Sequence, residues 1–385
     1  MCIRDSVIEK ARDHLFQGQC NCSYWHGAFG GIYLPHLRNA VYQHLIYADN
    51  LLDQESNSQT EWIDCVSEDF NFDGRPEIRL ANDQLVTWIS PAQGGYLYEL
   101  DVREIGHNLL ATMQRRPEAY HEKVRQAAEH QGEHHDGDDA ASIHDQVIFK
   151  QEGLQDHLHY DQHLRKSLID HFWDKDVSQH DIANGQAQER GDFVNGQFET
   201  TIRRNPNRIQ VMMQRTGNVF GQEITLSKGI TLNSGSCELE IAYMIENLPK
   251  DFECHFGVEF NVAGLPDGQD DRYFKNGDEN LGELGTTLDL PEEKQLHLVD
   301  RWLGLEVSLN LDQPAPIWTF PIRSVSQSES GFELVHQSVV VQPHWIVKPD
   351  ANGRWVAKMT LSSQTNPSAA LDTVNGGQTL ASDSV

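Results

Sequence analysis

Alternation of apolar and polar residues dominates the second half of the chain. Four well-separated segments place apolar side chains at every other position, a period of two that is typical of strands with one buried face. Residues from about 60 to 100 have the same strand-rich character. Many such segments predict a mainly β protein built as a large antiparallel β-sandwich. The alternating segments are Cys237 to Ile245, Phe256 to Val262, Leu303 to Leu311 and Trp355 to Leu361.

Near the N-terminus the apolar period is that of a helix. Residues 7–17 have the pattern of a helix end, and from Leu34 apolar residues recur at intervals of three and four. Pro35 suits the first turn of this second helix, where its missing N–H would be unpaired anyway. The pattern predicts that this helix ends within residues 53–60.

These patterns divide the chain into three parts. Residues 1–56 are predicted to be a helical segment, and residues 57–364 a β-sandwich with helical insertions near 117–172, around 117–130 and in part of 152–172. Residues 130–140 are low in apolar content and are predicted to form a loop. Residues 365–385 are small and polar, and we expect a disordered tail.

Charge narrows the classes of partner. The chain has 58 acidic and 30 basic residues and a formal net charge of −28. A field of this sign repels phosphate backbones and anionic lipid, so we expect no nucleic-acid partner and no membrane surface. Neutral oligosaccharides remain compatible, and the sequence does not specify an oligomeric state.

Cysteine usage and hydropathy indicate the compartment. The six cysteines are scattered apart from Cys20 and Cys22, with no disulfide framework, which favours a reducing environment. No window holds the roughly 18 apolar residues that a membrane-spanning helix needs. We therefore predict a cytoplasmic location.

The segment Gln19–Gly31 is the clearest candidate for function. It places Tyr24, Trp25 and His26 between small residues, just before the second predicted helix. Tyr and Trp rings offer flat faces on which a sugar can stack, and a His ring can donate or accept a hydrogen bond near neutral pH. We predict that these three residues bind substrate. The alternative is that the rings only pack a domain junction.

This segment resembles a signature of glycoside hydrolase family 57, the α-amylase and 4-α-glucanotransferase group. Cys22 stands where some members carry an aspartate, so the resemblance supports no acid role there. Shorter similarities follow in the family's order, among them Ser90–Asp101, Arg115–His121 and Ser167–Phe172. The matching residues of the signature are Cys20, Asn21, Tyr24, Trp25, His26, Gly27, Phe29, Gly30 and Gly31.

The resemblance carries expectations about fold and activity. It implies the end of a catalytic (β/α) barrel domain, followed by a β-sandwich of galactose-mutarotase-like type. It implies a retaining enzyme that acts on α-1,4-glucan, needs no organic cofactor, and passes the glycosyl unit to a sugar or to water. It places both catalytic carboxylates upstream of Gln19, so we expect no catalytic residue within this chain and no activity from it alone.

A second candidate site is the loop from Asp69 to Glu77. Oxygen-bearing side chains at Asp69, Asn71 and Asp73, followed by Gly74, match the first half of a calcium-binding loop. Glu77 is the candidate fourth ligand, and we predict a structural calcium ion. The alternative is a turn that is stabilised by its own local hydrogen bonds.

Two other functions remain open from the sequence. One is a stand-alone carbohydrate-binding β-sandwich. The other is an aldose-epimerase-like enzyme acting through His255 and Glu259, which lie four apart on a predicted strand and so share one face of the sheet.

Overall fold

Two helices precede two antiparallel sheets in this protein. The computed structural model describes residues 3–27, 30–57, 59–130, 149–263, 265–328 and 331–366. Within these ranges, no helix combines the length and the apolar character needed to cross a membrane. The helices are α1 (Ile3–Gly18), α2 (Pro35–Ser56), α3 (His121–His130) and α4 (Gln179–Ala183), with short 3-10 turns at η1 (Asn21–Ser23), η2 (Gly31–Tyr33) and η3 (Leu154–His157).

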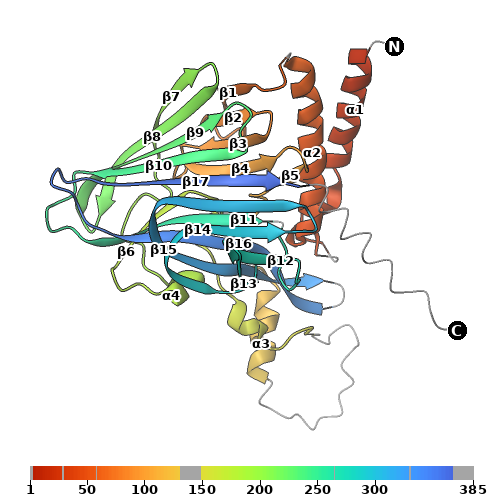
Figure 1. The fold of residues 1–385 in the computed structure, drawn as a ribbon. Helices are drawn as coiled ribbons and strands as arrows, with labels where there is room; N and C mark the ends of the chain where they lie inside the picture. The colour runs from red at the N-terminus through yellow and green to blue at the C-terminus, as the bar shows by residue number, and fades with distance from the viewer. Residues whose placement is uncertain are drawn as a thin grey trace, which may run out of the picture.

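Helices α1 and α2 lie side by side at one end of the sheets (Figure 1). Pro35 occupies the first turn of α2, as predicted, and the helix ends at Ser56. The buried face differs in detail from the predicted one, because Arg38 and Ile46 are buried whereas Leu52 is exposed. The buried Arg38 donates hydrogen bonds to Ala111, which follows the smaller sheet, and to Gln337 of the larger one, contacts that helical periodicity cannot reveal.

The smaller sheet has five strands in the order β1-β2-β3-β4-β5. It accounts for the strand-rich character predicted for residues 60 to 100. Its hairpin between β1 and β2 carries the candidate calcium loop. The strands are β1 (Ile63–Glu68), β2 (Glu77–Asn82), β3 (Leu85–Ser90), β4 (Tyr96–Val102) and β5 (His107–Asn108).

The main path of the larger sheet is β13-β12-β14-β15-β17-β10-β9-β8-β7. A branch leaves this path at β15, which also pairs with β16. Strand β16 pairs in turn with β11, and β11 with β6. All pairings between these strands are antiparallel. The strands are β6 (Ile169–Trp173), β7 (Glu199–Asn205), β8 (Arg208–Val219), β9 (Gln222–Asn233), β10 (Glu238–Glu246), β11 (Cys254–Ala263), β12 (Arg272–Asn276), β13 (Glu279–Glu283), β14 (Leu288–Asp300), β15 (Leu305–Ser328), β16 (Gly331–Val347) and β17 (Trp355–Thr365).

The long strand β15 joins the two layers of a sandwich. Its first residues pair with β17, and its later residues pair with β16 in the other layer. Between the layers lies one apolar core to which β8, β9, β10, β11, β16 and β17 all contribute. The alternation predicted in β10 is confirmed, since Leu239, Ile241, Tyr243 and Ile245 are buried and their neighbours are less so. The expected mainly antiparallel β fold, preceded by a helical segment, is therefore present.

Two predictions about individual elements need correction. The helical character expected in part of 152–172 is limited to the 3-10 turn at 154–157, because Ile169–Trp173 pairs with β11 as strand β6. Leu164, Leu168 and Phe172 are four residues apart, which imitates a helical stripe in the sequence. Strand β11 is buried on both faces rather than on one, so His255 and Glu259 are enclosed although they alternate with the apolar core residues.

Some predictions fall outside the described residues. The loop expected at 130–140 lies almost wholly in the range 131–148, which the structure does not describe, and most of the tail expected at 365–385 lies in 367–385. Thr365 is the last residue of β17.

Candidate functional site

The aromatic loop at Gln19–Gly31 is closed by its own backbone. Ile32 donates its N–H to the carbonyl oxygen of Trp25 at 3.0 Å. Gly31 has a φ of +52°, and a Cβ atom added there would lie 2.1 Å from the same carbonyl oxygen. Only glycine fits this position, because other residues would meet both backbone strain and a direct clash. Within the motif, residues 28–29, which include Phe29, lie outside the described residues.

Tyr24 and Trp25 face outward from this loop. Their exposed fractions are 57% and 54%, which is high for large aromatic side chains. The Tyr24 hydroxyl donates a hydrogen bond to the carbonyl oxygen of Gly18 at 2.7 Å, which fixes the ring to the end of α1. Both rings are therefore exposed on the surface of the loop.

His26 turns the other way and joins the loop to the sandwich. Its ring lies 5.2 Å from that of Tyr33 and 5.1 Å from that of Tyr120. Its Nε2 lies 3.1 Å from the carbonyl oxygen of Gln327, near the end of β15. A carbonyl oxygen only accepts, so Nε2 carries the proton and Nδ1 of the neutral ring is an acceptor.

Arg38 makes a second connection between the helices and the sandwich, one that sequence analysis missed. The side chain is buried and donates from Nε to the carbonyl oxygen of Ala111 at 3.1 Å and from Nη2 to Gln337 Oε1 at 2.8 Å. Burial lowers the pKa of this guanidinium to about 10. His26 thus connects the aromatic loop to the sandwich, and Arg38 connects the following helix to it. An arginine within a helical stripe gave no signal of this contact in the sequence.

The candidate calcium loop forms the turn between β1 and β2. Its side-chain oxygens accept hydrogen bonds from its own backbone: Asp69 from Asp73 N and Gly74 N, and Asn71 from Asp73 N. Glu77 accepts from Phe70 N at 3.1 Å. These bonds are the ones expected of the self-stabilised turn. The calcium ion itself stays a prediction.

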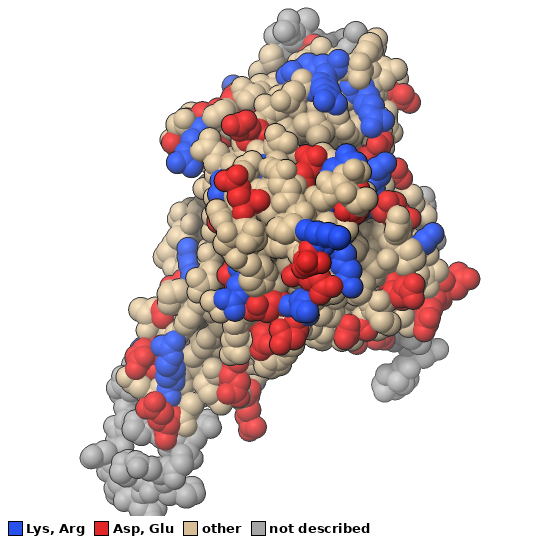
Figure 2. All heavy atoms as spheres, turned by 90° about the vertical axis from the view of Figure 1, so that its left-hand side faces the viewer, with Lys and Arg blue, Asp and Glu red and all other residues tan. Residues whose placement is uncertain are grey.

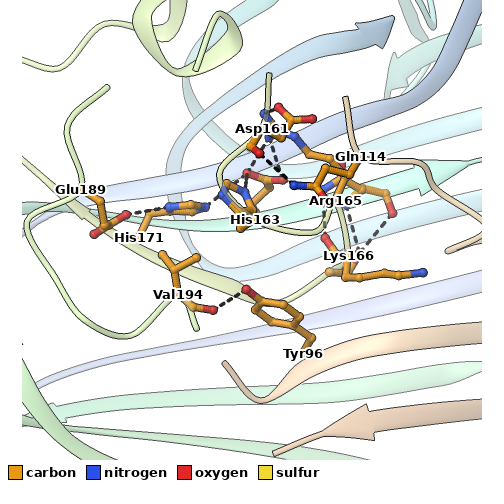
Figure 3. Close-up of polar contacts among 12 residues, drawn as sticks. Tyr96, Gln114, Asp161, His163, Arg165, Lys166, His171, Glu189 and Val194 are labelled. Atoms are coloured by element: carbon orange, nitrogen blue, oxygen red, sulfur yellow. Dashed lines mark hydrogen bonds and ion pairs between the residues drawn. The ribbon is translucent and has the colours of Figure 1, made fainter. Parts of the chain in front are cut away.

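A separate pocket opens on the outer face of strands β6 and β11, with a volume of about 310 Å³. Figure 3 shows its polar side chains converging from different parts of the chain. Glu259 from β11 is central: both of its oxygens accept from Arg165 Nη1 at 3.0 Å. Arg165 also donates to Asp161, which in turn is paired with Arg115.

Two histidines complete this pocket. Nε2 of His171 lies 3.2 Å and Nε2 of His163 3.5 Å from Glu259 Oε2. On its other side, His171 Nδ1 lies 2.8 Å from Glu189 Oε2. Burial alone would lower the pKa of His171, but its contacts with Glu189 and Glu259 outweigh this effect and raise it to about 9. Burial would likewise raise the pKa of Glu259, but Arg165 and the histidines hold it well below its usual range.

The structure separates the His255 and Glu259 pair that sequence periodicity suggested. The two residues share a face of β11, as expected, but their partners differ. His255 Nε2 lies 2.7 Å from His344 Nδ1, and its ring packs against Trp318. The charged or titratable partners of Glu259 are instead His163, Arg165 and His171, from the segment that precedes and begins β6. The sequence shows that these partners are histidines and an arginine, but nothing in it indicated that the segment 161–171 lies against β11.

On the inner face of β6, a buried ion pair joins the two layers. Lys228 from β9 donates to Asp170 Oδ2 at 2.8 Å, and both side chains have an exposed fraction of 0%. Lys228 also donates to the carbonyl oxygens of Gly94 and Leu168, while Tyr243 donates to Asp170 Oδ1. Asp170 thus takes part in a buried contact between the two layers.

Comparisons with known proteins fit this architecture, a β-sandwich preceded by helices that carry an aromatic loop. A family model described as alpha-amylase/4-alpha-glucanotransferase, C-terminal, matches residues 69–359, and one described as the middle domain of the same proteins matches residues 3–52. The chain belongs to this alpha-amylase/4-alpha-glucanotransferase family, glycoside hydrolase family 57, as its aromatic motif predicted.

Individual relatives show how much of their length the chain spans. It is 32% identical to alpha-amylase 1 of Dictyoglomus thermophilum, covering 91% of this chain and 48% of that protein. It is also 32% identical to a 4-alpha-glucanotransferase of Thermococcus litoralis, covering 88% and 46%. The crystal structure of 4-alpha-glucanotransferase from T. litoralis superposes with a TM-score of 0.70 at 26% identity, over 94% of this chain and 47% of that one. The chain thus spans about half the length of these relatives.

Proposed function

We propose that this chain serves in an enzyme that acts on α-1,4-glucan with retention, of the 4-α-glucanotransferase or α-amylase kind, and that its aromatic loop contacts the glucan. The observation that carries the proposal is the outward-facing pair Tyr24 and Trp25, held in a fixed loop of a chain that belongs to this family. A net charge of −28 also does not oppose a neutral sugar.

Each residue of the motif has a distinct part in this proposal. Trp25 stacks on a glucose ring, because its indole face is exposed and apolar. Tyr24 extends the same surface. His26 positions the loop through Gln327 and keeps Nδ1 as an acceptor for a sugar hydroxyl. Glucan is thus bound by the loop, and the sandwich fixes the position of the loop.

The size of the Trp25 contribution follows from its exposure. A Trp side chain has an area of about 250 Å², of which 54% is exposed here. Stacking on one face buries about half of that exposed area, roughly 65 Å². At about 25 cal/mol per Å² this contributes about 1.6 kcal/mol. A loss of that size weakens binding about 15-fold.

The test is a titration of the purified chain with maltoheptaose, followed by calorimetry. Trp25→Ala is compared with Trp302→Ala, a matched control because Trp302 is 55% exposed in the turn before β15. We expect the Trp25 variant to bind about 15-fold more weakly, by the area argument above, and the Trp302 variant to bind like the parent. Equal affinities for the Trp25 variant and the parent, or equal losses in both variants, would reject a stacking role for Trp25.

We also propose two accompanying features. Calcium is proposed as a structural ion at Asp69, Asn71, Asp73 and Glu77, supported by the spacing of their oxygens. A reducing, cytoplasmic compartment is proposed because the five cysteines among the described residues are free thiols.

A further inference from the structure

Two histidines and a glutamate in the sandwich pocket come together from three separate segments. His171 lies on β6 and Glu259 on β11, where the pairing of His171 with Gly257 and of Ile169 with Glu259 places both side chains on the same face. His163 approaches from the loop that precedes β6. Among the described residues, this is the only group of three or more His, Cys, Asp or Glu side chains whose ligand atoms all lie within 4.8 Å of one another.

The spacing of these atoms suits a shared metal ion. Oε2 of Glu259 lies 3.2 Å from His171 Nε2 and 3.5 Å from His163 Nε2. Two ligands of a tetrahedral ion, each about 2.0–2.1 Å from it, lie about 3.3 Å apart. Both Nε2 atoms are buried and face the same Glu259 oxygen, in contacts that fall outside hydrogen-bond geometry.

Neighbouring groups hold two of the three side chains, Glu259 and His171, in this orientation. Glu259 Oε1 accepts from Asn261 Nδ2 at 2.6 Å, which leaves Oε2 facing the histidines. The His171 Nδ1 contact with Glu189 at 2.8 Å is the carboxylate–histidine pairing that commonly orients a metal ligand. The ring of His171 also stacks on Trp173, with centroids 4.7 Å apart and planes 8° apart.

The charges around the group permit a divalent cation once it replaces the proton that His171 holds between Glu189 and Glu259. Arg165 contacts both Glu259 and Asp161, and Asp161 also pairs with Arg115, so two arginines and two carboxylates balance in charge. Glu189 contributes a further negative charge beside His171. The pocket beyond the three side chains supplies room for water or a small ligand at a fourth position. Two imidazoles and one carboxylate favour Zn²⁺ and similar transition metals over Ca²⁺ or Mg²⁺, which prefer oxygen alone.

We propose that His163, His171 and Glu259 bind one divalent transition-metal ion, of which Zn²⁺ is the best fit, with the fourth position open to the pocket. This site lies on the sandwich, apart from the aromatic loop, and its existence does not depend on the proposed glucan function.

The test begins with the chain stripped of metal by a chelator and then titrated with Zn²⁺ against a chromophoric chelator, with Co²⁺ as a second probe. We expect one equivalent of Zn²⁺ to be held, and visible d–d bands of tetrahedral Co²⁺. His163→Ala is the primary variant, because His163 lies in a loop and its side chain is 13% exposed, so the fold is expected to tolerate its loss. That variant should lose the bound equivalent and the Co²⁺ bands, and Glu189→Gln should bind roughly 10- to 100-fold more weakly.

Two controls make the result specific. His344→Gln removes a buried histidine whose neighbours are His255 and Trp318 rather than a carboxylate, and it should keep the bound metal. The double variant His134→Gln/His135→Gln removes the other histidine-rich run of the sequence and should also keep it. Failure of the parent chain to hold an equivalent, or retention of the metal by a folded His163→Ala variant, would overturn the proposal. The group would then be a charge-paired network only.

Discussion

Replacing Lys228 with methionine should destabilise the protein more than almost any surface change. Lys228 and Asp170 are fully buried between the layers, and the ammonium group donates to Asp170 and to two backbone carbonyl oxygens at 2.7 and 2.8 Å. Removing one partner of a buried ion pair typically costs about 3–5 kcal/mol, because the other charge stays buried without compensation. The two carbonyl groups also lose a donor, so we expect a loss of at least about 3 kcal/mol.

The assay is urea unfolding followed by tryptophan fluorescence. Lys228→Met should lower the midpoint without changing the slope, since the surface exposed on unfolding stays similar. The double variant Lys228→Met/Asp170→Asn should recover part of the loss, because no charge is then left in the core. Lys175→Met is the matched control: its pair with Glu253 is largely exposed, and we expect a change within about 0.5 kcal/mol.

The pH dependence of the same variant gives a second check. Burial raises the pKa of Asp170, and Lys228 opposes that effect. Without Lys228, the carboxyl group takes up a proton more readily, so the destabilisation should shrink as the pH is lowered. A loss below about 1 kcal/mol at neutral pH, or a double variant no more stable than the single one, would refute the reasoning from the buried pair.

Three further predictions follow from other parts of the chain. Gly31→Ala should destabilise the aromatic loop, because the new Cβ atom would lie 2.1 Å from the Trp25 carbonyl oxygen. We expect faster proteolysis within residues 19–31, and an unchanged rate would contradict this prediction. Asp267 contacts His336 and Arg323, which lower its pKa, so the contact should stabilise the protein fully above the unfolded pKa of about 3.9 and lose this effect as the pH falls below that value. Asp267→Asn should therefore make the free energy of unfolding less dependent on pH on the acid side. An unaltered pH dependence would count against the contact. Millimolar Ca²⁺ should raise the melting temperature of the parent but not of Asp69→Ala, whereas equal shifts in both would reject calcium at this loop.

Local patterns in the sequence predicted the elements that depend on neighbours along the chain. The period of two in β10 reflects one face packed in the core and one less buried, and the structure has that arrangement. The aromatic motif was visible as a run of neighbouring residues, and the structure adds that Gly31 has a positive φ and that Tyr24 and Trp25 are exposed.

Features that depend on long-range contacts were not visible in the sequence. Strand β11 reads as half-buried, but the segment 161–195 closes over its outer face and encloses Glu259 with His163 and His171. His163 and His171 lie about 90 residues before Glu259 in the sequence, and no periodic pattern links residues so far apart. His26 has the residue type of a sugar ligand, yet its Nε2 is taken by Gln327, which lies 301 residues away.

The most direct test of the central claim observes Trp25 itself. The chain contains eight tryptophans, which can be labelled together with 5-fluorotryptophan and followed by fluorine NMR. The resonance of Trp25 is assigned by its disappearance in Trp25→Phe. On addition of maltoheptaose, we predict a saturable shift of this resonance and no shift of the Trp302 resonance, assigned in the same way. An unchanged Trp25 resonance at saturating maltoheptaose would contradict the proposal that this loop contacts glucan.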